Sequence, residues 1–248
     1  METLRINTSE LAIFSKFEEA GLTELKQHIE GKSARKNNVE MAWDTLKLYA
    51  ENRFRHYPEI FPIEAPSYIR DLVAKHVCGV LKNRDKFGRR ILFFDMSKWD
   101  INDFSLDDLT IAGVIGAEAF WRNPEILENG LIIVENTIGF GMGHAKQHTM
   151  SRMNRMRNVF VQSFPVSIQG IFYLRMPYLF TLIFKMSRHL FPKKIRSRMN
   201  CYSSNQEPTE LYDIASPDIL PEWMGGKLKI EDAVEDAEFY ERFLPHKV

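Results

Sequence analysis

The chain has 248 residues, of which 44% are hydrophobic, and its 33 basic and 33 acidic side chains give a formal net charge of zero. This length and composition describe a globular protein that buries a substantial core and needs no disulfide or metal staple. The two cysteines, Cys78 and Cys201, show no ligand-like spacing, which argues against a cysteine-based zinc site and a disulfide framework.

The first part of the chain, residues 1–65, predicts a small helical domain. Apolar residues recur at helical spacing over residues 11–29, and a second helix is predicted over about residues 38–53. Two prolines in residues 61–66 indicate a linker to a second domain, residues 66–248. The N-terminus has no apolar run of signal-peptide type, so a cytoplasmic location is expected.

Strands alternate with helices in the second predicted domain. Helices are expected at residues 67–75, 106–121, 149–163 and 178–190. Strands are expected at residues 77–81, 90–94, 131–134, 168–174 and 199–203. This alternation predicts an α/β fold with a mostly parallel sheet.

The residues that follow the third predicted strand favour structural roles over catalytic ones. Gly139–Gly143 does not match a dinucleotide-binding pattern and is interpreted as a flexible turn. His144 and His148 lie one helical turn apart without a third ligand, so no metal site is expected. Glu135 follows the predicted strand and is interpreted as a capping or ion-paired residue rather than an acid or base. We therefore expect no enzymatic activity and no cofactor.

The helix predicted at residues 178–190 carries apolar stripes on two faces. A basic cluster follows it directly, formed by Lys193, Lys194, Arg196 and Arg198. Such a helix is either buried in the core or interfacial, with its rings in the acyl boundary and the cations on anionic head groups. The sequence leaves both interpretations open.

A stripe of small residues marks the helix predicted at residues 106–121. Thr110, Gly113 and Ala117 recur at intervals of three and four residues and therefore share one face. The small side chains admit the close approach of either another element or a bound ligand.

Charge is unevenly distributed in the second half of the chain. Residues 141–200 contain no Asp or Glu, whereas acidic residues dominate after residue 200. Either the two segments face one another in the fold, or the first presents a basic face to an anionic partner.

Several short motifs follow one another in a distinctive order along the chain. Pro217–Gly226 contains Leu-Pro, an acidic residue, an aromatic residue and Gly-Gly, and is similar to the closing motif of domains of the CRAL-TRIO family. Gly79–Arg89 resembles its opening motif, and Phe164-Pro165 and the helix-then-basic pattern at residues 178–198 follow in the expected order. Residues 34–49 resemble the family's small N-terminal helical domain.

The resemblance spans about residues 33–245 and is greatest to the branch that contains α-tocopherol and retinaldehyde carriers. It implies a helical N-terminal domain and an α/β lipid-binding domain whose sheet floors a closed hydrophobic cavity. It further implies that helix 178–190 is a gate that opens at a membrane. The cavity lining that it implies consists of Thr110, Gly113, Ala117, Leu131, Ile133, Met156, Val159, Phe160, Phe164, Ile168, Ile171, Phe180, Ile183 and Phe184.

Two sets of polar residues are candidates for contacts with a ligand or with phosphoinositide head groups. Thr110, Tyr173 and Ser163 are candidates for orienting a ligand. The basic positions that grip phosphoinositide phosphates in the tocopherol-carrier branch correspond to Arg35, Lys194 and Arg198. A further basic position of that branch is occupied by Ser167, which counts against phosphoinositide binding of the same type.

The resemblance implies an intracellular carrier that binds a hydrophobic small molecule or lipid and transfers it at membranes. Tocopherols, retinoids, carotenoids and phospholipids all remain candidate ligands. A lipid-sensing regulatory module that acts on a protein partner is the alternative. We expect a monomer that associates transiently with membranes carrying anionic lipids and does not bind nucleic acid.

Overall fold

A computed structural model describes residues 45, 47–121, 123–164 and 166–236 of the chain. The chain divides into two compact units, residues 1–44 and 45–248, and every described residue belongs to the second. The helix predicted at residues 11–29, and the beginning of the one predicted at 38–53, lie outside the described residues. The domain boundary predicted near residue 65 remains a prediction.

A five-stranded sheet forms the centre of the second unit, with the strand order β1-β2-β3-β4-β5. The strands are β1 (Cys78–Arg84), β2 (Arg90–Asp95), β3 (Leu131–Asn136), β4 (Ile168–Met176) and β5 (Met199–Ser203). β1 pairs antiparallel with β2 across a short turn, and the other three pairings are parallel. The predicted α/β class, the mostly parallel sheet and the five strand positions are thus confirmed.

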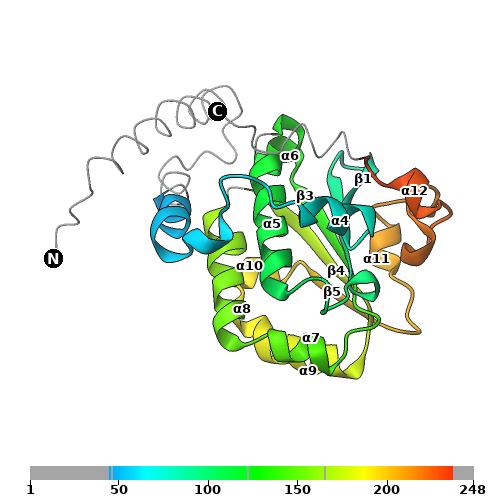
Figure 1. The fold of residues 1–248 in the computed structure, drawn as a ribbon. Helices are drawn as coiled ribbons and strands as arrows, with labels where there is room; N and C mark the ends of the chain where they lie inside the picture. Colours follow the sequence, from blue (N-terminus) through cyan, green and yellow to red (C-terminus); the bar gives the residue numbers. More distant parts are fainter. Residues whose placement is uncertain (1–44, 46, 122, 165, 237–248) are drawn as a thin grey trace. The chain divides into compact units, whose positions relative to one another are not determined.

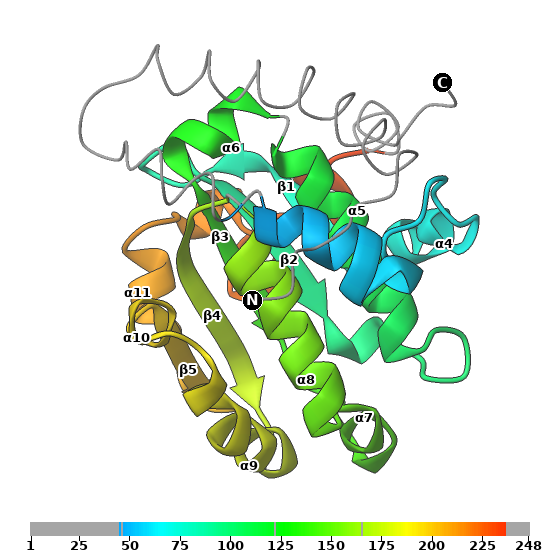
Figure 2. The same cartoon turned by 90° about the vertical axis from the view of Figure 1, so that its left-hand side faces the viewer.

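Helical crossovers connect the parallel strands and cover one face of the sheet. They consist of α5 (Leu106–Trp121) with α6 (Pro124–Asn129), α7 (Met142–Gln147) with α8 (Met150–Met156), and α9 (Tyr178–Ser187) with α10 (Lys193–Arg196). Because parallel crossovers are right-handed and the strand order runs in one direction, successive crossovers come to the same side. Figures 1 and 2 show α5 and α8 side by side over this face, with α7 and α9 adjacent at one end.

Two local signals explain the limits of the longest helices. Ser105 and Asp108 cap the start of α5 reciprocally, because the Asp108 carboxylate accepts from the Ser105 amide and the Asp108 amide donates to the Ser105 hydroxyl. α8 continues as a π-helical segment, Arg157–Ser163, and ends at Phe164 directly before a proline. The helices predicted at 106–121 and 149–163 are therefore confirmed.

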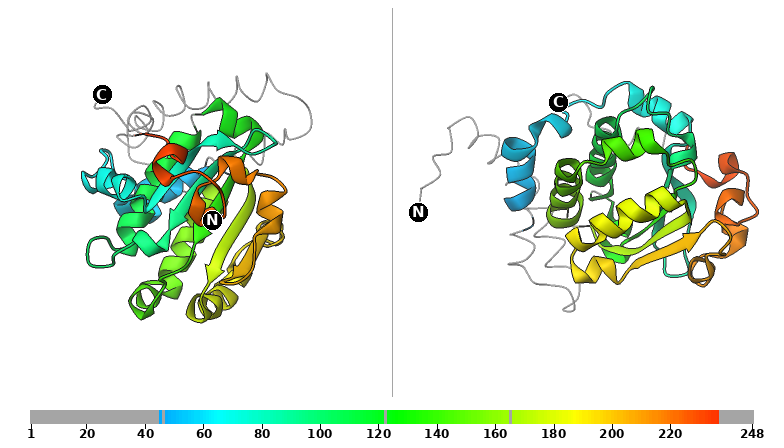
Figure 3. Two further views of the ribbon diagram at one scale, coloured as in Figure 1. Left: turned by 90° about the vertical axis from the view of Figure 1, so that its right-hand side faces the viewer. Right: turned by 90° about the horizontal axis from the view of Figure 1, so that it is seen from below.

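The C-terminal segment covers the opposite face of the sheet, which Figure 3 shows. It contains α11 (Thr209–Tyr212), α12 (Ile230–Ala233) and the 3-10 turns Pro217–Ile219 and Glu222–Met224. Its apolar side chains bury the face of the sheet that lies away from the crossover helices. The core on this face contains Phe93, Val134, Phe172, Leu211, Leu220 and Met224. This side of the sheet is densely packed, because each of those six side chains is at most 3% exposed.

Short elements precede the sheet. Residues 47–51 are helical, followed by a π-helical turn, Asn52–His56, and a 3-10 turn, Pro58–Ile60. This segment packs on α5 and on the π-helical segment, since Tyr49 donates to Glu118 and the Asn52 amide donates to the Asn158 carbonyl. α4 (Tyr68–Ala74) and the 3-10 turn Met96–Lys98 flank the first hairpin.

Candidate functional site

The helix-facing side of the sheet presents two parallel rows of side chains. Val80, Leu92, Ile133, Ile171 and Met199 are register partners from one strand to the next, and they form what we call the apolar row. Register partners in a sheet point to the same face and lie about 4.8 Å apart. The apolar row is therefore a continuous hydrophobic floor beneath the crossover helices.

The second row lies two residues further along β2, β3, β4 and β5, and two residues earlier in the antiparallel strand β1. It consists of Cys78, Phe94, Glu135, Tyr173 and Cys201, which are again register partners across all five strands. We call it the polar row, because it combines a carboxyl, a phenol hydroxyl and two thiols beside an otherwise hydrophobic floor. A row of this composition can bind an apolar molecule that carries a small polar group.

Glu135 has an unusual environment at the centre of the polar row. Within the described residues no hydrogen bond or ion pair reaches its carboxyl group, although the side chain is only partly accessible. Burial raises the pKa of Glu135 to about 7, because removal from water disfavours the charged form. The carboxyl is therefore able to carry its proton near neutral pH and to act as either a donor or an acceptor.

Tyr173 lies directly opposite Glu135 on β4. Its pKa is raised well above the usual value, first by burial and then by the neighbouring charges of Glu135 and Cys201. Its ring packs against Phe184 and Phe180 of α9, with centroid distances of 4.9 Å and 5.8 Å. The phenol hydroxyl is thus a neutral donor held in place by aromatic packing.

The predicted orienting residues other than Tyr173 are already engaged within their own helices. The Thr110 hydroxyl donates to the Leu106 carbonyl at 2.7 Å, and the Ser163 hydroxyl donates to the Val159 carbonyl at 2.6 Å. Each of these bonds joins residues four apart in a helix, which is the usual way for a buried hydroxyl to satisfy itself. Of the three candidates, only Tyr173 has a hydroxyl left for a ligand.

The predicted lining residues of α5 face the π-helical segment. Gly113 is exposed although α5 runs across the sheet, and a Cβ atom at this position would lie 2.9 Å from Cζ of Phe160. Ala117 is half-buried one turn further along, while Thr110 is buried. The small-residue stripe thus admits the Phe160 ring and leaves accessible surface beside it.

The remaining predicted lining residues fall into buried and half-buried groups. Leu131, Ile171, Val159 and Phe164 are buried. Ile133, Ile168, Met156, Phe160 and Ile183 keep accessible surface. The Phe164 ring packs against Tyr49 and Phe61 and therefore joins the side of the fold that holds residues 47–61. These half-buried residues lie either on the strands that form the two rows or on α8, the π-helical segment and α9.

One apolar stripe of α9 is buried in the protein and the other is exposed to solvent. Phe180 and Phe184 are buried against Tyr173 and Phe140. The opposite stripe is exposed, with 78% of Tyr178, 40% of Leu182 and 63% of Met186 accessible. The sequence shows both stripes, but their assignment to the two sides needs the position of the helix on the sheet.

The predicted basic positions differ in availability. Lys194 is exposed on α10, whereas the Arg198 guanidinium donates to the Ile168 carbonyl. The Ser167 hydroxyl accepts from the Gln169 side chain. Arg35 lies outside the described residues. Lys194, with its exposed neighbour Lys193, is thus the clearest cationic feature at this end of the fold.

The two histidines after the glycine-rich turn have structural contacts. The Gly141 amide donates to Nδ1 of His144, whose Nε2 lies 3.1 Å from the Trp99 carbonyl oxygen. Nδ1 of His148 lies 2.7 Å from the His144 carbonyl oxygen. In the described part of the chain, no cluster of His, Cys, Asp and Glu is arranged to hold a metal ion.

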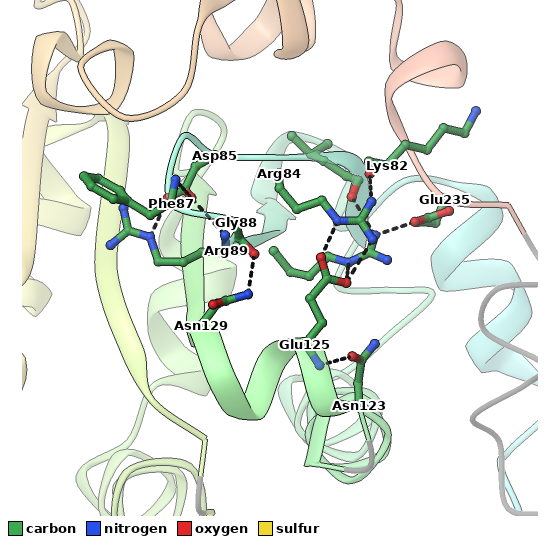
Figure 4. A network of polar contacts seen from close by, with 12 residues as sticks. Lys82, Arg84, Asp85, Phe87, Gly88, Arg89, Asn123, Glu125, Asn129 and Glu235 are labelled. Atoms are coloured by element: carbon green, nitrogen blue, oxygen red, sulfur yellow. Dashed lines mark hydrogen bonds and ion pairs between the residues drawn. The ribbon is translucent and has the colours of Figure 1, made fainter. Parts of the chain in front are cut away.

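Polar contacts of the opening motif, Gly79–Arg89, hold the turn between β1 and β2 and connect it to neighbouring elements, as Figure 4 shows. Asp85 is buried between β1 and β2 and accepts hydrogen bonds from the Phe87 and Arg89 amides at 2.9 Å. Beside it, Glu125 of α6 pairs with Arg84 and Arg90, and Arg90 also pairs with Glu235. These residues connect the first hairpin to α6 and to the C-terminal segment.

The closing motif needs its two glycines for steric reasons. A Cβ atom on Gly226 would lie 1.9 Å from the Leu220 carbonyl oxygen, and one on Gly225 would lie 1.8 Å from the Tyr212 hydroxyl oxygen. Gly225 also has a φ of +85°, which disfavours other residues. The motif therefore closes the C-terminal segment tightly against the sheet.

The fold and the two rows define a class of protein: an α/β domain with a hydrophobic helix-facing floor and few polar groups. The CRAL/TRIO domain family matches residues 74–226. The chain therefore belongs to the CRAL-TRIO family, whose members bind and transfer lipids.

Curated relatives cover the same region. Clavesin-2 of Rattus norvegicus is 28% identical over 150 residues, which are 60% of this chain and 45% of that protein. Clavesin-1 of the same species is 27% identical over 150 residues, which are 60% of this chain and 42% of the relative. The match thus spans less than half the length of these relatives.

The crystal structure of Sfh5 aligns with 97% of this chain and 97% of its own, with a TM-score of 0.55 and 11% sequence identity. At this identity the similarity establishes the shared fold. Among the described residues, no helix has both the length and the apolar character needed to cross a bilayer.

Proposed function

We propose that the protein is an intracellular carrier that encloses one hydrophobic small molecule or lipid and exchanges it at membranes. The ligand lies between the two rows of the sheet and the inner sides of α5, the π-helical segment and α9. Residues 1–65 form the family's N-terminal helical domain, and residues 66–248 form the lipid-binding domain.

The observation that carries the proposal is the difference between the two faces of the sheet. On the face covered by the C-terminal segment, Phe93, Val134 and Phe172 are at most 3% exposed. On the helix-facing side, Ile133 and Glu135 keep accessible surface in the middle of the central strand, and Gly113 does so on α5. A packed core leaves no such surface, so an unfilled space beside these residues accounts for it.

The apolar lining provides affinity for a hydrophobic ligand. Removal of apolar ligand surface from water stabilises the complex by about 25 cal/mol for each Å². Half-buried Met156, Phe160 and Ile183 give the lining some adaptability, since methionine fills irregular spaces. Tocopherols, retinoids, carotenoids and phospholipids are all compatible with such a lining.

α9 is the gate in this proposal. Its inner stripe, Phe180 and Phe184, closes over Tyr173, while Tyr178, Leu182 and Met186 face outward. At a membrane the outer stripe enters the acyl boundary, and acyl chains rather than water cover the apolar surface that opening exposes. Lys193 and Lys194 follow α9 directly and face anionic head groups during this contact.

The experiment begins with native mass spectrometry of the purified protein and identification of any extracted ligand. Transfer of that ligand, or of a fluorescent lipid probe where none co-purifies, is then measured between donor and acceptor vesicles. The double variant Leu182→Asp with Met186→Asp is expected to keep its ligand and to lose at least tenfold in transfer rate.

Ile63→Asp provides the matched control, because Ile63 is 85% exposed but lies outside α9 and the two rows. It is expected to transfer at the wild-type rate. Wild-type transfer by the α9 double variant would contradict the gate, and failure of the wild-type protein to bind any of the candidate lipid classes would contradict the carrier function itself.

A further inference from the structure

We propose that Ser197 is a phosphorylation site, and that a phosphate group on it releases the carrier from anionic membranes. The modifying partner is a serine kinase that selects basic residues. This inference rests on the proposed function, because it names the regulation of the membrane contact made by α9 and the basic cluster behind it. It depends on where the Ser197 hydroxyl lies and on the charges around it.

Ser197 lies at the carboxyl-terminal end of α10, directly before Arg198 and β5. The residue is exposed, and its hydroxyl donates to the Lys194 carbonyl oxygen at 2.9 Å. Because this hydrogen bond lies at the surface, water replaces it at little cost. The Ser197 oxygen is therefore accessible to an enzyme that approaches from solvent.

The basic cluster surrounds Ser197 in the chain. Three of its cations precede the serine and one follows it, in the order Lys193, Lys194, Arg196 and Arg198. Arg188 adds a further cation in space, since its guanidinium donates to the Arg196 carbonyl oxygen. No Asp or Glu occurs between residues 141 and 200, and within the described residues none of these cations forms an ion pair. A kinase whose substrate groove carries carboxylates thus meets complementary charge at this serine.

Ser197 differs from the other serines of the acid-free stretch, residues 141–200. Three of them are buried or half-buried, namely Ser163, Ser167 and Ser187. Ser151 is exposed, but the cation beside it, Arg152, is already paired with Asp107 of α5. Of the described serines in this stretch, Ser197 alone is both exposed and next to cations without an ion-pair partner.

The local backbone can open for a kinase. An active site of this kind takes its substrate serine in an extended segment, so α10 has to unwind. α10 has only four residues, which is too short for a helix to be stable without tertiary contacts. Half-buried Ile195 is its apolar contact with the core. Opening so small a unit costs far less than unfolding the sheet, which can therefore stay folded while Ser197 reacts.

The reaction is a phosphoryl transfer from ATP. The Ser197 oxygen bonds to the γ-phosphorus as the bond from that phosphorus to the β–γ bridging oxygen breaks, and a carboxylate of the kinase accepts the hydroxyl proton. ADP leaves. The product carries about 1.5 to 2 negative charges at neutral pH. The phosphate therefore offsets about half of the positive charge of the basic cluster.

This loss of positive charge weakens the proposed membrane contact. Each charge near an anionic lipid surface changes binding by about fivefold. A phosphate with about two negative charges is thus expected to weaken binding by about twentyfold. The outer stripe of α9, with Tyr178, Leu182 and Met186 exposed, keeps its apolar character, so contact with an uncharged lipid surface is expected to stay unchanged.

The first experiment establishes whether Ser197 accepts a phosphate. Purified serine kinases that select basic residues are incubated with the full chain and ATP, and the modified residue is located by tandem mass spectrometry. Phosphate is expected on Ser197, and Ser197→Ala is expected to remove that signal. No phosphate, or phosphate only on other residues, would overturn the modification site.

The second experiment measures what the phosphate does. Ser197→phosphoserine is introduced during synthesis of the full chain, and its binding to vesicles with and without phosphatidylserine is measured by sedimentation. Binding to phosphatidylserine vesicles is expected to fall about twentyfold and to recover after phosphatase treatment, which shows that the fold is intact. Ser216→phosphoserine is the matched control, because Ser216 is exposed on the C-terminal segment, behind the opposite face of the sheet. The control is expected to bind as the unmodified protein does.

The outcomes separate this inference from the carrier function. Undiminished binding of the Ser197 phosphoprotein, or an equal loss in the Ser216 phosphoprotein, would overturn the switch and leave the carrier intact. Failure of the unmodified protein both to bind phosphatidylserine vesicles and to transfer lipid between vesicles would contradict the proposed function itself.

Discussion

Glu135 and Tyr173 lie opposite each other on β3 and β4, and within the described residues neither side chain has a hydrogen-bond partner. The Glu135 carboxyl is therefore expected to make the stability of the protein depend on pH even in the absence of a ligand. Burial alone holds the pKa of the Glu135 carboxyl at about 7, compared with an ordinary value of 4.5.

The stability of the ligand-free protein is expected to fall between about pH 4.5 and pH 7 relative to Glu135→Gln. The folded protein holds the Glu135 proton more tightly than the unfolded chain, so the stabilisation is complete below pH 4.5 and is lost as the pH passes the folded pKa. At about 1.4 kcal/mol for each pKa unit, the full difference is about 3 kcal/mol. Urea unfolding of both proteins at several pH values measures it.

The neighbouring groups do not interfere in this window. Tyr173 and Cys201 have pKa values raised by burial from already high ordinary values, and that of Cys78 is about 12. Stability curves for wild type and Glu135→Gln that run parallel from pH 4.5 to pH 8 would show that Glu135 is not desolvated in the folded protein.

Gly226→Ala is expected to lower the free energy of unfolding by about 2 kcal/mol, because the added methyl group meets the backbone of Leu220 and the closing segment must shift. Gly116→Ala in α5 is the matched control. Its Cβ atom would lie 3.9 Å from the Phe120 ring, and alanine favours a helix over glycine. The control is expected to be neutral or stabilising, and equal losses in both variants on chemical denaturation would contradict the steric explanation.

Glu235→Gln is expected to cost about 1 to 3 kcal/mol, since it removes a carboxylate from Arg90, whose side chain is 8% exposed. Figure 4 shows that Glu125 remains as a second partner, which limits the loss. Asp218→Asn breaks an exposed ion pair with Lys227 and is expected to leave the free energy of unfolding almost unchanged. Chemical denaturation of the two variants compares them, and a larger loss for Asp218→Asn would refute this ranking.

Lys193→Gln combined with Lys194→Gln is expected to weaken binding to phosphatidylserine-containing vesicles by about fivefold for each lysine removed. Both lysines are exposed on α10. Vesicle sedimentation at two salt concentrations measures the effect, which is expected to shrink as salt rises. Lys229→Gln, an exposed lysine on the C-terminal segment, is the control, and an equal effect there would point to overall charge rather than to α10.

Local patterns predicted most of the fold. Periodicity placed all five strands and gave the bounds of α5, and the order of the sequence motifs indicated the CRAL-TRIO family. Short helices such as α7, α11 and α12 were not predicted. They have four to six residues, too few to show a helical repeat, and they depend on tertiary packing for their stability.

The candidate site was only partly predictable. The strand predicted at residues 131–134 extends to Asn136, which makes Glu135 a strand residue on the face of Ile133 rather than a cap. Alternation at two-residue intervals carried that signal, but a single strand cannot show which face is buried or what lies opposite. Only the register with β4 brings Tyr173 to Glu135.

Local sequence patterns were therefore sufficient to predict the elements, their order and the small set of polar residues among the apolar ones, because these depend on neighbours in the chain. Tertiary structure decided which stripe of α9 faces inward and which face of the sheet stays less densely packed, and it decided that Thr110 and Ser163 are already satisfied. Those outcomes depend on contacts between residues that are far apart in the chain, and periodicity carries no information about such contacts.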